Sequence, residues 1–347
     1  MKKQSIISYG GYYSTGGTVI RDIFREFSPL IDFPTEFRII KERSGILDLD
    51  RAINIEIAPE NVGLAIQNFI WLSENLARKD SRFSKCGFSY DEYTNGDFRV
   101  NTKNYIDALV NYYYPMDWHY LRFSQSWTKQ IIDKAYKKLI VSDRRKLHGS
   151  NLYPMIALPD KLFVEKTRNY FLSLFDSIRD YRNIGKNSIL GLHNAVPIFH
   201  PELIERVRLF VPGIKVFIVD RDPRDNFLNL SKDSYSRYLP KNCSILKKAQ
   251  CFINFYKSVR RNKEKLKEMN NVYFYNFEDF CLNYEDTTKR LFKESKILLS
   301  SNHKFRKKIF NPEESKKNIF MYKNISKDSL PAINLIEKNL EEYLYNG

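Results

Sequence analysis

Residues Gln4–Phe24 have the sequence QSIISYGGYYSTGGTVIRDIF, in which a short apolar run is followed by four glycines and then by a helical pattern. The run Ser5–Ser8 is long enough for one buried parallel strand. From Thr18 onward, apolar residues recur at helical spacing with charged residues between them. Strand, glycine-rich turn and helix together form a cradle for a phosphate, because glycines let the backbone approach the anion and the first helical amides point at it. One interpretation of the start of the chain is therefore a site for a phosphate group.

The spacing Gly11-x-x-x-x-Gly16-Gly17-Thr18 is that of a Walker A loop, except that Gly17 occupies the position of the lysine. In a nucleoside triphosphatase that lysine contacts the β- and γ-phosphates. Its absence disfavours a P-loop kinase or NTPase, which stays the alternative enzyme class. An ordinary glycine-rich turn is the other interpretation, and the stretch alone favours neither.

Apolar runs and helical patterns alternate along the rest of the chain. Further strands are predicted at Pro34–Glu42, Ser188–Leu192, Lys215–Val219 and Asn271–Tyr275. Helices are predicted at Asn61–Ala77, Trp127–Val141, Leu162–Ile178, Pro201–Phe210, Ile245–Lys267, Asp286–Lys296 and Leu330–Tyr345. This alternation predicts an α/β fold with a P-loop-like parallel sheet flanked by helices. We expect a single domain over residues 1–347, with a large helical insertion at 46–180.

A second motif, IKVFIVDRDPRD, occupies Ile214–Asp225, where an apolar strand ends in R-x-P-R-D. A glycine-rich loop near the N-terminus followed later by this motif resembles the paired signatures of the sulfotransferases that use 3′-phosphoadenosine 5′-phosphosulfate (PAPS). The resemblance covers about residues 1–45 and 185–345 and leaves out the helical middle. It implies a bacterial enzyme that moves a sulfuryl group from PAPS to a hydroxyl of a carbohydrate, such as a surface polysaccharide or its precursor.

The resemblance also implies which residues bind the donor. The loop would hold the 5′-phosphosulfate through Ser14, Thr15, Gly16, Gly17 and Thr18. The 3′-phosphate would be held by Arg221 and Asn229, and by a basic C-terminal segment containing Lys316 and Lys317. For that segment, a solvated run of lysines is the alternative interpretation.

Three positions depart from the family pattern. Ser14 occupies a position where lysine or arginine is common, and Arg21 or a lysine from the C-terminal tail would have to replace that charge. Asn229 replaces the usual serine, with Ser231 as the alternative contact, and Phe277 replaces a frequent tyrosine.

His193 is the predicted general base, because sulfuryl transfer requires the acceptor hydroxyl to lose its proton. It follows the predicted strand Ser188–Leu192 directly, and LHNAVP resembles the strand-H-x-x-P segment that carries the base in the family. The other four histidines lack this context. Because ligands of parallel sheets bind at the carboxyl ends of the strands, the loop, His193 and Arg221 are expected to converge on one edge.

The helical insertion is predicted to bind the acceptor. It contains NYYYPMDWHY at Asn111–Tyr120, whose aromatic side chains, with Asp117 and His119, could line a sugar pocket. The edge of a hydrophobic core is the favoured interpretation of this segment.

The net charge of +16, from 57 Lys and Arg against 41 Asp and Glu, favours anionic partners. A basic nucleic-acid-binding protein without catalysis is the non-enzyme alternative, but no nucleic-acid motif supports it, and no nucleic acid is expected. The four cysteines form neither C-x-x-C pairs nor metal-type clusters with histidine, so no metal is predicted. No apolar run suits a signal peptide or a transmembrane segment. The expected location is the cytoplasm, with peripheral contact at the inner membrane left open; no oligomeric state is predicted.

Overall fold

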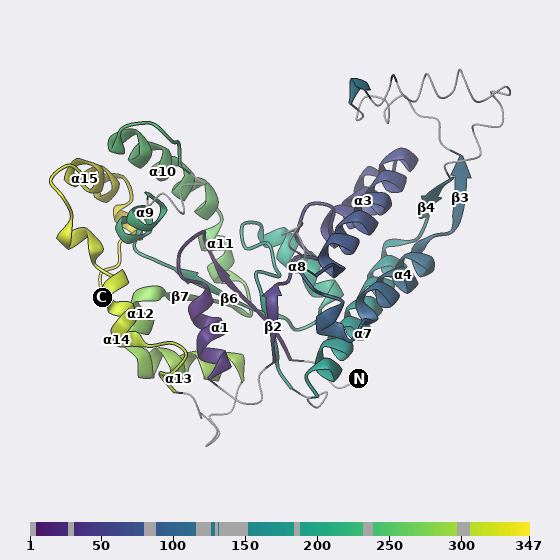
Figure 1. Ribbon diagram of the computed structural model, residues 1–347, viewed down its shortest axis with the longest axis horizontal. Helices are drawn as coiled ribbons and strands as arrows, with labels where there is room; N and C mark the ends of the chain where they lie inside the picture. Colours follow the sequence, from purple (N-terminus) through teal and green to yellow (C-terminus); the bar gives the residue numbers. More distant parts are fainter. Residues whose placement is uncertain are drawn as a thin grey trace. The chain divides into compact units, whose positions relative to one another are not determined.

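The computed structural model describes residues 5–26, 31–79, 88–115, 126–128, 131, 152–183, 188–231, 239–296 and 306–347. The chain forms two compact units, both shown in Figure 1. The first comprises Met1–Arg38 and Ile178–Gly347, and the second comprises Ile39–Ser177. Each unit is described by itself below.

The first unit is built on a parallel sheet of five strands in the order β2-β5-β1-β6-β7. The strands are β1 Ile6–Gly11, β2 Ile31–Glu36, β5 Leu190–His193, β6 Lys215–Asp220 and β7 Val272–Asn276. Its helices are α1 Thr18–Arg25, α8 Pro201–Phe210, α9 Pro223–Ser231, α10 Ile245–Arg260, α11 Lys263–Glu268, α12 Phe277–Leu282, α13 Tyr284–Ser295, α14 Pro312–Ser315 and α15 Leu330–Asn339. The predicted α/β class with a parallel sheet flanked by helices is confirmed.

The central strands β5, β1 and β6 are buried on both faces, which explains why they are apolar runs without polar alternation. On one face, Ile7 and Tyr9 of β1 and Phe217 of β6 pack against the apolar sides of α1, α12 and α13. Ile6 of β1 and Ile218 of β6, which point to the opposite face, are also buried. A second cluster joins α9, α10 and α15.

Strand β1 lies at the centre of the sheet, and the later strands are added first on one side of it and then on the other. After β1 the chain builds β2 and β5 on one side, and β6 and β7 follow on the other side. The register pairs Tyr9 with His193 and Gly11 with Val219. The carboxyl ends of β5, β1 and β6 therefore lie side by side at a topological switch point, where α/β sheets bind their ligands.

The second unit contains α2 Ile46–Arg51, a π-helical turn Ala52–Glu56, α3 Pro59–Ala77, a 3₁₀ turn Glu92–Thr94, α4 Asp97–Leu109, β3 Tyr112–Pro115, β4 Leu152–Met155 and most of α7 Asp160–Tyr181. Strands β3 and β4 form an antiparallel pair. The helices α4 and α7 are joined by stacked rings of Tyr105 and Tyr170, whose centroids are 4.6 Å apart. The hydroxyls of these two tyrosines lie within hydrogen-bond distance of Thr167 and Thr102, respectively. The antiparallel pair β3–β4 was not predicted from the sequence.

Several predicted element boundaries are wrong. The strand expected at Pro34–Glu42 is β2, which ends at Glu36; Pro34 lies in an edge strand at an irregularity in the pairing with β5. Beyond it, the carbonyls of Ile39 and Ile40 accept from the amides of Ile46 and Leu47, so this part of the chain is a turn. The expected helix Ile245–Lys267 is divided at residues 261–262 into α10 and α11.

Two further expectations concern the ends of the helical block and of the chain. The helix expected at Leu330–Tyr345 ends at Asn339 and is followed by a 3₁₀ turn, Glu341–Tyr343. The favoured core interpretation of Asn111–Tyr120 is wrong for Tyr112 and Tyr113, which are 54% and 55% exposed. Residues 116–120 of that segment, and most of the helix expected at Trp127–Val141, lie outside the described residues.

Candidate functional site

The loop between β1 and α1 is pinned to the sheet by its own side chains and backbone. The hydroxyl of Thr15 is buried and donates to the carbonyl of Val219 in β6 at 2.7 Å. The side-chain amide of Asn226 in α9 donates to the carbonyl of Tyr13 at 3.1 Å. Tyr13 and Ser14 both have positive φ angles, 36° and 57°. Thr15 thus fixes the loop in place, while Ser14 is half-buried and Thr18 is exposed at the first turn of α1.

Two glycines of the loop are required by close approach of other groups. Gly16 has φ +86°, and a Cβ atom there would lie 2.5 Å from the ring of Phe277. A Cβ atom at Gly17 would lie 2.5 Å from the carbonyl carbon of Gly10 and 2.8 Å from the nitrogen of Gly11. Because these are backbone atoms of β1, no side chain fits at Gly17 without displacing the strand. The backbone of β1 therefore leaves no room for a lysine at residue 17, the position at which Walker A loops carry one.

Arg221 follows β6 directly and is 5% exposed. One of its terminal nitrogens donates to the carbonyl of Asn318, and its guanidinium carbon lies 5.1 Å from the centroid of the Phe277 ring. With its amide oxygen turned toward the guanidinium, Asn229 of α9 accepts from Arg221, at 3.3 Å from Nη2. The Nε atom of Arg221 has no hydrogen-bond partner among the described residues. Burial lowers the pKa of Arg221.

The structure thus brings together three parts of the predicted 3′-phosphate site: Arg221, Asn229 and the segment that contains Lys316 and Lys317. Ser231, the alternative to Asn229, donates its hydroxyl to the carbonyl of Leu228 in its own helix at 3.0 Å. Lys316 is exposed and pairs with Glu313 at 2.9 Å, and Lys317 is exposed.

The rest of the R-x-P-R-D motif holds the C-terminal segment beside Arg221. The carboxylate of Asp225 is fully buried and accepts from the amides of Phe320 at 2.6 Å and Tyr322 at 3.3 Å. Arg224 pairs with Asp222 at 2.6 Å, and its guanidinium carbon lies 3.6 Å from the ring centroid of Tyr322. The motif is therefore an anchor for residues 318–322 as well as the source of Arg221.

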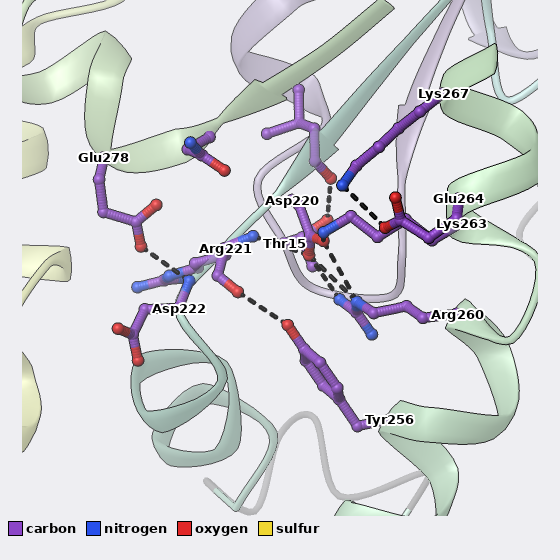
Figure 2. A network of polar contacts seen from close by, with 12 residues as sticks. Thr15, Asp220, Arg221, Asp222, Tyr256, Arg260, Lys263, Glu264, Lys267 and Glu278 are labelled. Carbon is purple, nitrogen blue, oxygen red and sulfur yellow. Dashed lines mark hydrogen bonds and ion pairs between the residues drawn. The ribbon is translucent and has the colours of Figure 1, made fainter. Parts of the chain in front are cut away.

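A buried ion-pair network supports the backbone of Arg221, as Figure 2 shows. Asp220 pairs with Arg260 at 2.6 Å and with Lys263 at 2.7 Å. Although burial raises the pKa of Asp220, the charges of these two partners hold it well below its usual range. The guanidinium of Arg260 lies 4.5 Å from the ring centroid of Tyr12 and 3.4 Å from that of Tyr256. The Tyr256 hydroxyl donates to the carbonyl of Arg221 at 3.2 Å.

Glu278 is a fully buried carboxyl group near Arg221 (Figure 2). Its Oε1 atom accepts from the amide of Asp222 at 2.9 Å, and its Oε2 atom has no hydrogen-bond partner among the described residues. Burial raises the pKa of Glu278 to about 7, with the nearby Arg221 charge opposing that shift. Its charge therefore changes close to neutral pH.

His193 ends β5 and faces the side of the sheet that α1 covers. Its ring stacks on that of Tyr9, with centroids 5.4 Å apart and planes inclined by 17°. The hydroxyl of Tyr9 donates to Asp32, which also pairs with Arg25 at 2.8 Å. The ring of His193 thus lies against the ring of Tyr9 in β1, the strand that precedes the glycine loop.

A second candidate base, Glu36, lies at the same edge and was missed by sequence reasoning. Glu36 ends β2; its Oε1 atom accepts from the side-chain amide of Asn194 at 2.9 Å, and Arg38 pairs with its other oxygen. Asn194 in turn follows His193, and its backbone amide donates to the carbonyl of Tyr9 at 2.8 Å. A correct end for this strand would have marked Glu36 as a polar residue at the carboxyl edge of the sheet. The predicted strand instead continued six residues too far, to Glu42.

A pocket of about 340 Å³ opens beside the first turn of α1. Thr18 and Val19 of α1, the ring of Phe277 and the apolar side chains of Ile309 and Phe310 line it, and so do Asn311 and Lys308. Lys307, Asp22 and Glu314 line it as well, so the pocket combines one aromatic ring with mainly polar walls that carry charges of both signs.

Within the described ranges, no group of three His, Cys, Asp or Glu side chains could hold a metal ion. Among those residues there is also no helix with the length and hydrophobicity to cross a bilayer. Asp117, Trp118 and His119, which belong to the predicted acceptor segment, lie outside the described residues.

No family model, no curated protein and no solved structure matches this chain.

Proposed function

We propose that this protein is a PAPS-dependent sulfotransferase that transfers a sulfuryl group to a carbohydrate hydroxyl. The observation that carries the proposal is the convergence of both motifs on Phe277. Its ring touches the loop at Gly16, and the guanidinium of Arg221 lies 5.1 Å from its centroid. A nucleotide with phosphates on both its 5′ and 3′ positions requires two anion sites on either side of one base and sugar, and this arrangement fits that requirement.

The proposal assigns each part of the donor to a described group. The phosphosulfate faces the loop and the first amides of α1, where the helix dipole favours negative charge. The adenine occupies the pocket lined by Val19 and Phe277. The 3′-phosphate meets Arg221, with the Asn229 amide beside it.

The lack of space for a side chain at Gly17 argues against the kinase or NTPase alternative. ATP-dependent P-loop enzymes use a lysine there on the β- and γ-phosphates, and the strand backbone leaves no space for it. A donor that ends in a sulfuryl group carries less charge at that point than a triphosphate, which is consistent with a loop built only of glycines and hydroxyl residues.

In the proposed reaction, the acceptor oxygen forms a bond to sulfur while the bond between sulfur and the bridging phosphate oxygen breaks. The acceptor proton passes to a base, and the electron pair of the broken bond goes to 3′-phosphoadenosine 5′-phosphate. His193 is the proposed base, and Glu36 is the competing candidate at the same edge. The loop amides and the α1 dipole stabilise the charge on the leaving phosphate.

Calorimetric titration of the protein with 3′-phosphoadenosine 5′-phosphate, adenosine 5′-phosphosulfate, ATP and DNA tests the proposal. Arg221→Ala should weaken binding of 3′-phosphoadenosine 5′-phosphate by about 1.5–3 kcal/mol, the scale of a hydrogen bond to a charged group. It should leave binding of adenosine 5′-phosphosulfate nearly unchanged, since that nucleotide lacks the 3′-phosphate.

Arg290→Ala is the matched control, because Arg290 also stacks on an aromatic ring, that of Tyr275, at 4.4 Å. It should affect neither ligand. An equal loss for both nucleotides in Arg221→Ala would contradict the assignment of Arg221. Binding of ATP or DNA in preference to 3′-phosphoadenosine 5′-phosphate would contradict the proposed function itself.

A further inference from the structure

Three half-buried aromatic rings meet at the start of the glycine loop, and we refer to Tyr13, Phe199 and Phe255 as the aromatic platform. The rings of Tyr13 and Phe199 stack with centroids 5.6 Å apart and planes inclined by 11°. Phe255 lies 5.3 Å from Tyr13 at an inclination of 49°. The three residues come from the loop after β1, the connection between β5 and α8, and α10. Each has intermediate exposure, so part of its surface is open to solvent.

Two asparagine side chains hold the platform in place through hydrogen bonds to its backbone carbonyls. The side-chain amide of Asn226 donates to the carbonyl of Tyr13 at 3.1 Å, and that of Asn262 donates to the carbonyl of Phe199 at 2.8 Å. Tyr13 has φ 36°, a conformation that costs a non-glycine residue about 1–2 kcal/mol. The loop has glycine at four other positions but carries a large ring at this strained one. The contacts of its ring with Phe199 and Phe255 accompany this unfavourable backbone conformation.

The location of the platform suits the acceptor better than the donor. Tyr13 directly precedes Ser14–Thr18, where the proposed function puts the reacting phosphosulfate. Phe199 follows His193 by six residues, in the connection that begins at the end of β5. Both connections leave the carboxyl edge of the sheet, where the candidate bases His193 and Glu36 also end their strands.

The chemistry of the platform selects the class of ligand. Flat aromatic faces bind the apolar C–H faces of pyranose rings, while the hydroxyls at the ring edge stay available for hydrogen bonding and for reaction. We infer that the aromatic platform holds the pyranose ring of a carbohydrate acceptor. This inference rests on the proposed function, and it assigns acceptor contact to the unit that carries the donor motifs, where the sequence predicted it in the insertion 46–180.

The test uses saturation-transfer NMR on the full chain with a pool of tetrasaccharides built of glucose, galactose, mannose and N-acetylglucosamine. Aromatic protons of the protein are irradiated, with and without 3′-phosphoadenosine 5′-phosphate, and transfer to the pyranose C–H protons is measured. Phe255→Leu and Tyr13→Leu keep apolar bulk and remove the ring faces. The expected result is a strong transfer in the wild type and about a tenfold loss of oligosaccharide affinity in both variants. Tyr112→Leu and Tyr113→Leu, which change exposed tyrosines of the insertion, are the matched controls and should bind the pool normally.

Each outcome bears on a different statement. Unchanged transfer in Phe255→Leu and Tyr13→Leu, or its loss only in the Tyr112 and Tyr113 variants, would overturn the platform. A wild type that binds 3′-phosphoadenosine 5′-phosphate but shows no transfer to any tetrasaccharide would overturn the carbohydrate class and leave the donor site intact. Failure of the wild type to bind 3′-phosphoadenosine 5′-phosphate would contradict the proposed function. Thermal melting and nucleotide affinity of each variant, expected to match the wild type, show that the fold is kept.

Discussion

The backbone carbonyl carbon of Gly10 lies 2.5 Å from the point where a side chain at residue 17 would begin. This close approach distinguishes the loop from Walker A loops, which carry a lysine at the same position. Under the proposed function, the loop would therefore bind its anion through amides and hydroxyls. The proposal then assigns the positive charge for the rest of the donor to Arg221, which lies against Phe277 at the end of β6.

Two residues compete for the role of general base, and a paired measurement on single variants separates them. His193→Ala should lower the single-turnover rate with bound PAPS by about 10²–10⁴-fold, the usual contribution of a positioned acid–base group. Calorimetric affinity for 3′-phosphoadenosine 5′-phosphate should stay at the wild-type value, because the proposed phosphate contacts do not include His193. Glu36→Gln, which keeps the hydrogen bond from Asn194, should cost less.

The outcome is checked against His200→Ala, a half-buried histidine that immediately precedes α8 and should turn over normally. Normal turnover in His193→Ala combined with a large loss in Glu36→Gln would transfer the role to Glu36. Loss of nucleotide affinity together with turnover in His193→Ala would show that His193 acts only through its stacking on Tyr9.

At the scale of secondary-structure elements, α9 acts as an anchor for a segment that lies almost a hundred residues further along the chain. Asp225 accepts two backbone amides of residues 320 and 322, and Arg224 stacks on Tyr322. Phe320 has φ +56°, which such contacts have to stabilise. The helix thereby keeps residues 318–322 beside Arg221.

Removal of that anchor should release the segment. Asp225→Ala leaves the amides of Phe320 and Tyr322 without their acceptor, at about 1.5–3 kcal/mol for each bond to the carboxylate. Cleavage by trypsin after Lys316 and Lys317 should accelerate by about tenfold or more, since the protease acts on the locally opened state. Asp328→Ala, an exposed aspartate of the same region, is the control and should be cleaved at the wild-type rate. Equal cleavage rates in the two variants would show that α9 does not hold the segment.

At the scale of the whole molecule, the buried Glu278 couples global stability to pH. The pKa of Glu278 is raised from 4.5 to about 7 by burial, so the folded protein keeps this proton over a range in which the unfolded chain has released it. Because the native state binds the extra proton, the free energy of unfolding should fall as pH rises from 4.5 to about 7, by up to about 3 kcal/mol. Urea unfolding across this range measures the slope.

Glu278→Gln should remove this part of the slope, since a glutamine cannot titrate. The exposed Glu264→Gln in α11 is the matched control and should keep the wild-type slope. The difference between wild type and Glu278→Gln isolates the contribution of Glu278 from that of other groups, including Asp220, whose lowered pKa acts at more acidic pH. Parallel pH profiles for wild type and Glu278→Gln would rule out the titration of Glu278 as a source of the pH dependence.

The sequence by itself determined the fold class and the neighbourhood of the site. Strands that are buried on both faces have to be continuous apolar runs, so β1, β5 and β6 can be recognised as such runs, and the edge strand β7 also has a mainly apolar sequence. Glycines and motif residues placed directly after those runs have to lie at the carboxyl edge of a parallel sheet. This local logic brought the loop, His193 and Arg221 to one edge, and it failed at β2, where Pro34 and an edge position weaken the pattern.

Only the tertiary structure decided the contacts that give the site its chemistry. The position of Phe277 between Gly16 and Arg221, the pairing of Glu36 with Asn194, the packing of Arg260 between two tyrosine rings and the aromatic platform all join residues from different elements. Sequence periodicity describes which face of an element is apolar, and it contains no information on which distant side chain meets that face. Those contacts depend on the strand order, which is set by the packing of the whole chain around β1.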